Sequence, residues 1–336
     1  MMLARAKFVF LLIVVVLDFP PTLRGQSENR VIRVHTDLTV VSACVYDRDG
    51  RFIGGLDQSN FNLLENGVQQ KIEFFESVDE PFTALLLFDT SGSVRDYMPE
   101  VVRAANTFVS QLRSEDRIAV AFFTDDTKIH ILLEPTKRKD FDQVVDIEAN
   151  GRDSSYTTTF DAVKKALKFL EPIKGKKALV LFSDGEQFGR HASAKSNLRN
   201  AEEQEAVIYT LQFGEYPQAD PDFSRVVVDQ FQIVPPNGST KGASRKEIEK
   251  LIARVDRYMK GLAERTGGRA YKVNSINDLS STFRTIAAEL GTTYRLGYSP
   301  TDTPKDGEKR TISVKVDVPN AAVRSRKEVV YKSAAR

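Results

Sequence analysis

Residues 85–94 read LLLFDTSGSV, and this stretch constrains the fold more than any other part of the sequence. An uninterrupted apolar run leads directly into Asp89, Ser91 and Ser93, which stand at alternate positions. Runs that are apolar throughout are typical of central parallel strands with helices on both faces. Open α/β sheets bind ligands at the carboxyl ends of such strands. The stretch therefore predicts a buried parallel strand that ends in an oxygen-rich loop.

The same rhythm continues beyond this strand. Further apolar runs are RIAVAFF at residues 117–123, KALVLF at 177–182 and VIYTLQF at 207–213. Helical patterns predict helices over residues 95–112, 139–148, 160–170, 192–205, 246–265 and 276–289. This alternation predicts an α/β domain over residues 82–290 with a doubly wound, mostly parallel sheet. Prolines in residues 214–244 interrupt the alternation and predict a surface excursion.

Two β-rich segments flank the α/β domain. Residues 31–80 and 292–333 alternate apolar and polar side chains, and turn pairs such as Asn66-Gly67 separate the runs. Each segment is too small to bury a face well by itself. We therefore expect both to contribute to one small all-β sandwich, with the α/β domain inserted in it or flanked by it.

The N-terminal residues have the pattern of an export signal. Arg5 and Lys7 precede FVFLLIVVVL at residues 8–17, an apolar run too short to span a bilayer as an isolated helix. We expect residues 1–25 to be a signal peptide, cleaved between residues 20 and 30. The mature chain would be exported, to the periplasm, the cell envelope or the medium, with no transmembrane span. An uncleaved N-terminal anchor is the alternative, because no Ala-x-Ala cleavage pattern is present.

Composition narrows the class of protein. The 336 residues are 41% hydrophobic and 28% charged, which are ordinary values for a globular protein. A formal net charge of +2 lacks the basic excess of a dedicated nucleic-acid binder. Cys44 is the single cysteine, so no internal disulfide can form, and its alternating segment predicts a buried side chain. The basic run at residues 174–177 predicts a solvated face.

Oxygen donors follow three segments that the fold would bring to one rim. The first loop offers one carboxylate and two hydroxyl groups, which suit Mg²⁺ or a similar hard cation. SSYTTTFDAV at residues 154–163 places hydroxyl groups before a helix, and LVLFSDGEQ at residues 179–187 ends an apolar strand in Ser-Asp-Gly. A hydroxyl and a carboxylate from these loops would complete an oxygen site. The alternative is that Asp89 and Ser91 only cap the following helix.

Together the three motifs resemble the metal-ion-dependent adhesion site of von Willebrand factor type A (VWA) domains. They are Asp-x-Ser-x-Ser at residues 89–93, a Thr about four residues before the Asp-Ala-Val at 161–163, and the Ser-Asp-Gly at 183–185. The likeness covers roughly residues 82–290. The flanks further resemble the exported VWFA-related proteins first grouped from acidobacteria, in GGLDQSNFNLLENGVQQKI before the domain and in TTYRLGYSP and RTISVKV after it.

The resemblance implies a role for each residue of the motifs. In the family's scheme Ser91 and Ser93 would coordinate the metal directly. Asp89 and Asp184 would act mainly through bound waters, or as exchangeable ligands.

A threonine from the second loop would join them in the ligand-competent state. The family often has Gly-Gly-Thr there, whereas this chain has Ser-Tyr-Thr-Thr-Thr at residues 155–159. The spacing favours Thr157 and leaves Thr158 as the alternative.

These roles imply an exported, metal-dependent module that binds other proteins. Mg²⁺ is the expected ion, with Mn²⁺ and Ca²⁺ as alternatives. Since the directly bound donors would be neutral, the cation would keep much of its charge and attract an Asp or Glu of a partner protein. The competing hypothesis is a structural or assembly component of a cell-envelope complex, with the site permanently occupied or unused.

The sequence lacks residues that enzymes with motifs similar to the first loop require. DTSGS resembles the Asp-Thr-Gly-Ser of aspartic proteases, yet Ser91 is interposed and no second copy supplies the dyad. A haloacid-dehalogenase-type phosphatase would need a carboxylate where Ser91 stands. The sequence has neither a Walker A loop nor a Gly-x-Ser-x-Gly elbow. Hydrolysis at the metal would lack a general base beside the site, so we expect no enzymatic activity.

Overall fold

The computed structural model describes residues 38–91, 94, 97–123, 127–132, 158–183, 192–213, 245–273 and 278–332. For residues 127–132, 245–249 and 251 it describes the backbone alone. The expected signal peptide, the expected helix over residues 139–148 and the proline-rich residues 214–244 lie outside the described residues.

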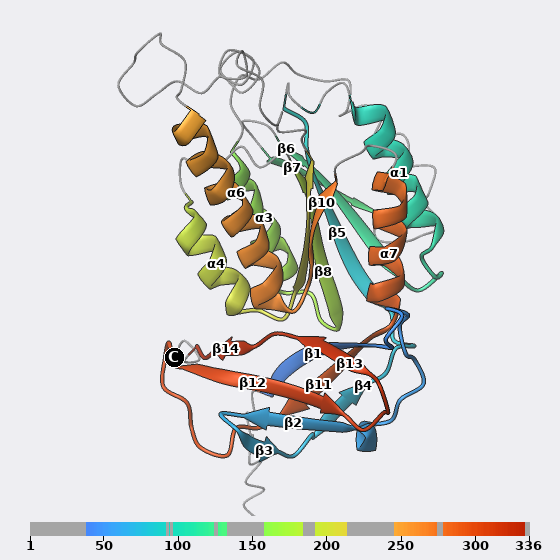
Figure 1. Cartoon of the computed structure of the whole chain (residues 1–336), viewed down its shortest axis with the longest axis vertical. Coiled ribbons are helices and arrows are strands. Elements are labelled where there is room, and N and C mark those ends of the chain that lie inside the picture. Colours follow the sequence, from blue (N-terminus) through green and yellow to red (C-terminus); the bar gives the residue numbers. More distant parts are fainter. Residues whose placement is uncertain are drawn as a thin grey trace, which may run out of the picture. The chain divides into compact units, whose positions relative to one another are not determined.

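A six-stranded sheet forms the centre of the α/β domain (Figure 1). In spatial order its strands are β10 (Ala270–Val273), β9 (Val207–Phe213), β8 (Lys176–Ser183), β5 (Phe82–Asp89), β6 (Arg117–Phe123) and β7 (Thr127–Leu132). The first five run parallel, and β7 pairs antiparallel with β6. β5, β8 and β9 are buried along their whole length. The fully apolar runs therefore form the central strands, as expected.

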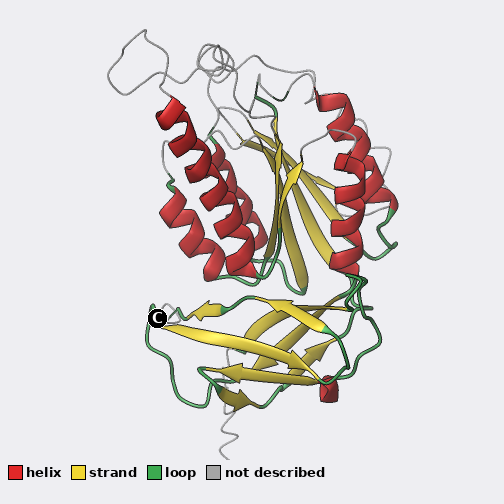
Figure 2. Cartoon of the chain, in the orientation of Figure 1, coloured by secondary structure: helices red, strands yellow, loops and turns green. Residues whose placement is uncertain are grey.

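Helices cover both faces of this sheet (Figure 2). One face carries α1 (Met98–Ser110) and α7 (Leu279–Gly291), and the other carries α3 (Thr159–Leu170), α4 (Ala194–Glu202) and α6 (Arg245–Thr266). Along β5, Leu86 and Phe88 join the core beneath α1 and α7, and Leu85 and Leu87 join the core beneath α3 and α6. Because successive strand residues face opposite ways, Asp89 lies on the same side as Leu87.

Two antiparallel four-stranded sheets form the sandwich. One contains β13 (Ala322–Ser325), β1 (Thr39–Tyr46), β11 (Thr293–Tyr298) and β4 (Phe74–Glu76); the other contains β14 (Glu328–Val330), β12 (Lys309–Val316), β2 (Phe61–Glu65) and β3 (Val68–Gln70). A short 3₁₀ helix, η1 (Gln58–Asn60), precedes β2. Each sheet mixes strands from both ends of the chain, since β1 pairs with β11 and β2 pairs with β12. Val41, Leu63, Tyr294 and Ile312 share one core between the sheets.

The predicted fold class is confirmed: the chain is a mixed α/β protein with a mostly parallel, helix-covered sheet and additional antiparallel sheets. The helix boundaries differ in detail. α1 begins at Met98 instead of residue 95, because Pro99 lacks a backbone N–H and fits only the first turn.

α6 ends at Thr266, directly before a glycine pair. Gly267 has φ +83°, a conformation that glycine adopts without strain. The N–H of Gly268 then donates to the carbonyl of Ala263 at 2.9 Å, which closes the helix end. A Cβ at Gly268 would lie 2.0 Å from the Ile208 carbonyl oxygen, so this glycine lets the chain approach β9.

Burial corrects one expectation and confirms another. The basic run at residues 174–177 is not a solvated face throughout, because Lys176 is 5% exposed and Lys177 is 8% exposed. Lys177 Nζ donates to the carbonyls of Leu170, Glu171 and Ile173, and so caps the end of α3. Cys44 is buried, as predicted.

None of the helices in the described part of the chain is both long enough and apolar enough to cross a membrane.

Candidate metal centre

The carboxyl ends of β5 and β8 place two polar side chains beside each other. The strands pair in parallel register from Phe82↔Lys176 to Phe88↔Phe182. The next residues along are Asp89 and Ser183, which end their strands. A short connection joins the C terminus of α3 to the start of β8, so the N terminus of α3 lies at the same edge.

Asp89 is fully buried, and hydrogen bonds hold its carboxylate. Oδ1 accepts the backbone N–H of Ser91 at 2.9 Å, and Oδ2 accepts the hydroxyl of Ser183 at 2.7 Å. Both Asp89 and Ser183 have 0% exposure. A buried carboxylate requires such bonds, because removing its charge from water is otherwise costly. The first loop and strand β8 thus fix the orientation of Asp89 together.

The loop after Asp89 is tied to the neighbouring strand. Thr90 donates both its N–H, at 3.0 Å, and its hydroxyl, at 3.2 Å, to the carbonyl of Phe123 at the end of β6. The N–H of Val94 donates to the carbonyl of Ser91 at 3.1 Å and closes a turn. Ser91 is 4% exposed, so its side chain lies just below the surface of this edge.

The geometry argues against the helix-cap alternative for this loop. α1 begins only at Met98, and the N-cap residue is Tyr97. An N-cap residue must directly precede the helix, whereas Asp89 and Ser91 belong to the strand end and to an earlier turn.

The second loop reaches the edge through Thr158. This residue is the N-cap of α3, is 4% exposed, and makes no side-chain capping hydrogen bond. Its carbonyl accepts the N–H of Ala162 at 2.9 Å. Thr158 is therefore placed at the same edge as Asp89, and Thr157 directly precedes it in the sequence.

The structure covers part of the sequence-derived site. Asp89 and Ser91 are brought together at the carboxyl edge of the sheet. Ser93, Thr157 and Asp184 lie outside the described residues, and their roles as ligands stay predictions.

Ser183 is a residue whose role the sequence reasoning missed. The sequence marked it only as the first residue of Ser-Asp-Gly. The available signal was its position as the last residue of a buried run, two residues beyond Leu181, where a polar side chain replaces the apolar pattern.

The described donors suit a hard divalent cation. Asp89 and Ser91 offer carboxylate and hydroxyl oxygens at one buried loop, and Mg²⁺ prefers oxygen ligands. Among the residues that the structure describes, no three His, Cys, Asp or Glu side chains form a group that could hold a metal ion. The hydroxyl groups beside Asp89 are thus the feature that favours an oxygen site here.

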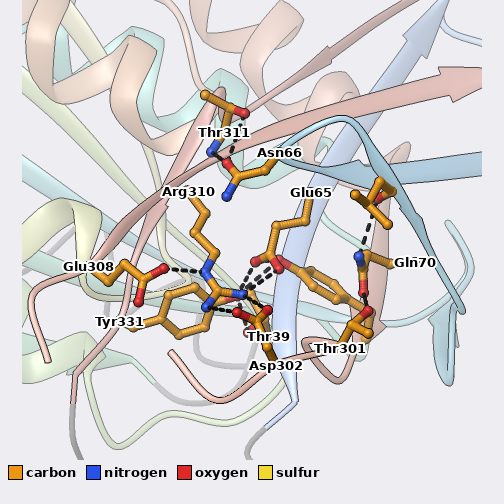
Figure 3. Close-up of polar contacts among 12 residues, drawn as sticks. Thr39, Glu65, Asn66, Gln70, Thr301, Asp302, Glu308, Arg310, Thr311 and Tyr331 are labelled. Atoms are coloured by element: carbon orange, nitrogen blue, oxygen red, sulfur yellow. Dashed lines mark hydrogen bonds and ion pairs between the residues drawn. The ribbon is translucent and has the colours of Figure 1, made fainter. Parts of the chain in front are cut away.

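A second polar cluster lies in the sandwich (Figure 3). Glu65 and Arg310, both 3% exposed, form an ion pair at 2.9 Å, and the hydroxyl groups of Tyr298 and Tyr331 donate to Glu65. Burial and the Glu65 carboxylate raise the pKa of Tyr331 to about 12. Arg310 also pairs with Asp302 and Glu308. These charged and hydroxyl groups pair with one another across β2, β12 and the C-terminal segment of the sandwich.

Comparison with protein families finds a match within the α/β domain. Residues 84–187 match the model of the von Willebrand factor type A domain. No curated protein matches the chain.

Three of the similar solved structures illustrate the range of matches. An aerotolerance-related membrane protein from Bacteroides fragilis is 16% identical, with a TM-score of 0.43, over 63% of this chain and 98% of that one. A von Willebrand factor type A protein from Catenulispora acidiphila is 11% identical, with a TM-score of 0.43, over 88% of this chain and 75% of that one. Proximal thread matrix protein 1 from the mussel byssus, with a zinc-occupied MIDAS motif, is 13% identical, with a TM-score of 0.42, over 63% of this chain and 48% of that one.

Proposed function

Since the chain carries a von Willebrand factor type A domain, we propose that it is a non-enzymatic binding protein that holds a partner protein through a metal ion. The supporting observation is the buried carboxylate of Asp89. Ser91 and Ser183 hold it at the sheet edge where α/β folds bind ligands.

The proposed cation is Mg²⁺. Ser91, Ser93 and a threonine, Thr157 or Thr158, supply neutral oxygens, and Asp89 and Asp184 act mainly through bound waters. The bonds that Asp89 accepts from Ser91 and Ser183 support this role, because a carboxylate held by two donors can orient water at a fixed position.

The proposed partner group is an Asp or Glu side chain of another protein. A cation whose direct protein ligands are neutral keeps most of its charge, and an external carboxylate would neutralise it. Such a contact, desolvated by the surrounding surface, can dominate an interface.

The proposed location is outside the cytoplasm, in the cell envelope or beyond it. Support comes from the N-terminal sequence, where Arg5 and Lys7 precede the apolar residues 8–17.

Calorimetric titration of Mg²⁺ and Mn²⁺ into the wild type and Asp89→Ala tests the metal site. We expect the wild type to bind and the variant to show no measurable binding, with unchanged far-UV circular dichroism. Asp49→Asn, which alters an exposed carboxylate of the sandwich, is the control and should bind like the wild type. Equal affinity in folded wild type and Asp89→Ala would contradict the proposal.

The partner is tested by recovery of envelope proteins on the immobilised chain, with Mg²⁺ and with EDTA. We expect the same bound protein to be lost on chelation, regained on adding Mg²⁺, and absent with Asp89→Ala.

A further inference from the structure

We propose that Ser183 is a positioning residue for the cation site, and that its hydroxyl sets the orientation in which Asp89 serves the metal. This inference rests on the proposed function and adds a residue outside the predicted ligand set. Ser183 would act through Asp89 and would not touch the ion itself.

The register of the sheet brings the two side chains together. β5 and β8 are adjacent central strands, and Asp89 and Ser183 each follow the last pair of the ladder, Phe88↔Phe182. Leu87 and Leu181 join the same core, so the residues two positions further on emerge on that same face. The contact is therefore fixed by the backbone of two rigid elements.

The hydrogen bond has the properties of a charge-assisted one. The Ser183 Oγ to Asp89 Oδ2 distance is 2.7 Å, within the short range of O–H donors bound to carboxylates. Neither residue is exposed, so water does not compete for the bond. Because the Ser91 N–H occupies Oδ1, the two donors approach different oxygens and prevent rotation of the carboxylate.

The polar character of Ser183 is otherwise unexpected. The inward positions before it on β8, Leu179 and Leu181, are apolar and belong to the core beneath α3 and α6. A buried hydroxyl at the next position needs an acceptor, and Asp89 provides it. Alanine would fill nearly the same space, so the hydroxyl matters for Asp89 more than for packing.

The test measures Mg²⁺ and Mn²⁺ affinity of the full chain by calorimetry in four proteins: wild type, Ser183→Ala, Ser183→Thr and Ser183→Cys. Partners that orient metal-binding groups typically change affinity by about 10- to 100-fold when removed. We expect a weakening of that size in Ser183→Ala. Ser183→Thr keeps the hydroxyl and should recover most of the affinity, whereas Ser183→Cys keeps the shape with a weak donor and should fall between them.

Thr210→Val is the matched control. Thr210 lies on the neighbouring strand β9, is fully buried, and donates its hydroxyl to the carbonyl of Met259. Its loss should lower stability while metal affinity stays within about twofold of the wild type, because the bond does not involve Asp89.

A double-mutant cycle gives a readout without metal. Ser183→Ala and Asp89→Ala should be strongly non-additive in urea unfolding, since each removes the same hydrogen bond.

The outcomes separate the two proposals. A wild type that binds neither ion overturns both the proposed function and this inference. A wild type that binds, with a folded Ser183→Ala of equal affinity, overturns this inference alone. Equal losses in Ser183→Ala and Ser183→Thr also overturn it, because they would assign the effect to packing.

Discussion

Lys176 begins β8 with its ammonium group inside the protein. Its Nζ donates to the carbonyl of Ser77 at 2.6 Å, in the segment that joins β4 to β5. Arg113 donates to the carbonyls of Asp79 and Glu80 in the same segment, both at 2.9 Å. Burial lowers the pKa of Lys176 to about 8, with the Glu76 carboxylate opposing the shift. Lys176 and Arg113 thus bind the backbone of the segment that leads from the sandwich into the α/β domain.

Folding stability should therefore depend on pH through Lys176. The folded state binds this proton less tightly than the unfolded chain does, so the penalty is fully present below pH 8. It fades as the pH rises toward the usual lysine pKa of about 10.4. We expect the free energy of unfolding attributable to Lys176 to rise by about 2–3 kcal/mol across this interval.

Urea unfolding of the wild type and Lys176→Met, measured from pH 7 to 10, checks this. Burial also lowers the pKa of Lys177, but that lysine is present in both proteins, so the difference between them isolates Lys176. Parallel pH profiles would show that the Lys176 side chain keeps its ordinary pKa in the fold.

Basic side chains from α6 and from the sandwich contact the C-terminal end of α4. Glu202 is 5% exposed and pairs with Arg265 of α6 and with Lys309 of β12. Arg326 is also 5% exposed, and it donates to the carbonyls of Glu202 and Gln204. These bonds satisfy carbonyls that a helix end leaves unpaired. The end of α4 is thereby tied to the sandwich by charge and by backbone hydrogen bonds.

We expect Glu202→Gln to lower the free energy of unfolding by about 1–2 kcal/mol, since the two cations are half exposed and regain water. Glu264→Gln is the control. Glu264 pairs with Lys260 on the surface of α6, with 64% and 66% of the two side chains exposed, and should change stability by less than about 0.5 kcal/mol. Chemical denaturation of both variants provides the comparison. Equally small decreases in the free energy of unfolding would show that the ion pairs of Glu202 do not stabilise the contact between α4 and the sandwich.

The elements that the sequence predicted correctly are those with a local signature. The runs that became β5, β6, β8 and β9 are mostly apolar, and a pair of glycines, Gly267 and Gly268, directly follows α6. The bond between Asp89 and Ser183 could not be predicted in this way, because it depends on which strands are neighbours and in which register.

The burial of charged residues could not be predicted from the sequence for the same reason. The run at residues 174–177 looks solvated in sequence, yet Lys176 and Lys177 find carbonyl partners at the ends of other elements. Only the three-dimensional arrangement supplies those partners. At the candidate site, the motifs gave the types of donor, whereas the support of Asp89 by β8 required the assembled sheet.

At the scale of the whole molecule, the α/β domain leaves the sandwich after β4 and returns to it at β11. Its two cores are built from its own strands and helices. Glu289 at the end of α7, in contrast, pairs with Arg324 of β13 and accepts the Tyr209 hydroxyl at 2.5 Å. The domain boundaries remain predictions. If the α/β domain were produced without the sandwich, it would lose the contacts that Glu202 and Glu289 make with the sandwich.

We expect a fragment of residues 80–291 to fold, because the described residues of its two cores all lie within this range, but to be less stable than the same domain in the full chain. Loss of Arg324 and Arg326 takes one partner from the Glu289 carboxylate and one from the backbone carbonyls at the end of α4. Urea unfolding followed by far-UV circular dichroism measures the difference. An unfolded fragment would show that the sandwich is needed for folding, and a fragment of undiminished stability would show that these junction contacts contribute nothing.

The pairing of β1 with β11 also has a consequence for biosynthesis. β1 finds its neighbours β11 and β13 only after the whole α/β domain has been synthesised, since both strands follow that domain in the sequence. Such a high contact order slows folding and leaves strand edges open to unwanted pairing in the meantime. The α/β domain, whose contacts are more local, can fold first and bring the two chain ends together, so that the sandwich closes as the final step.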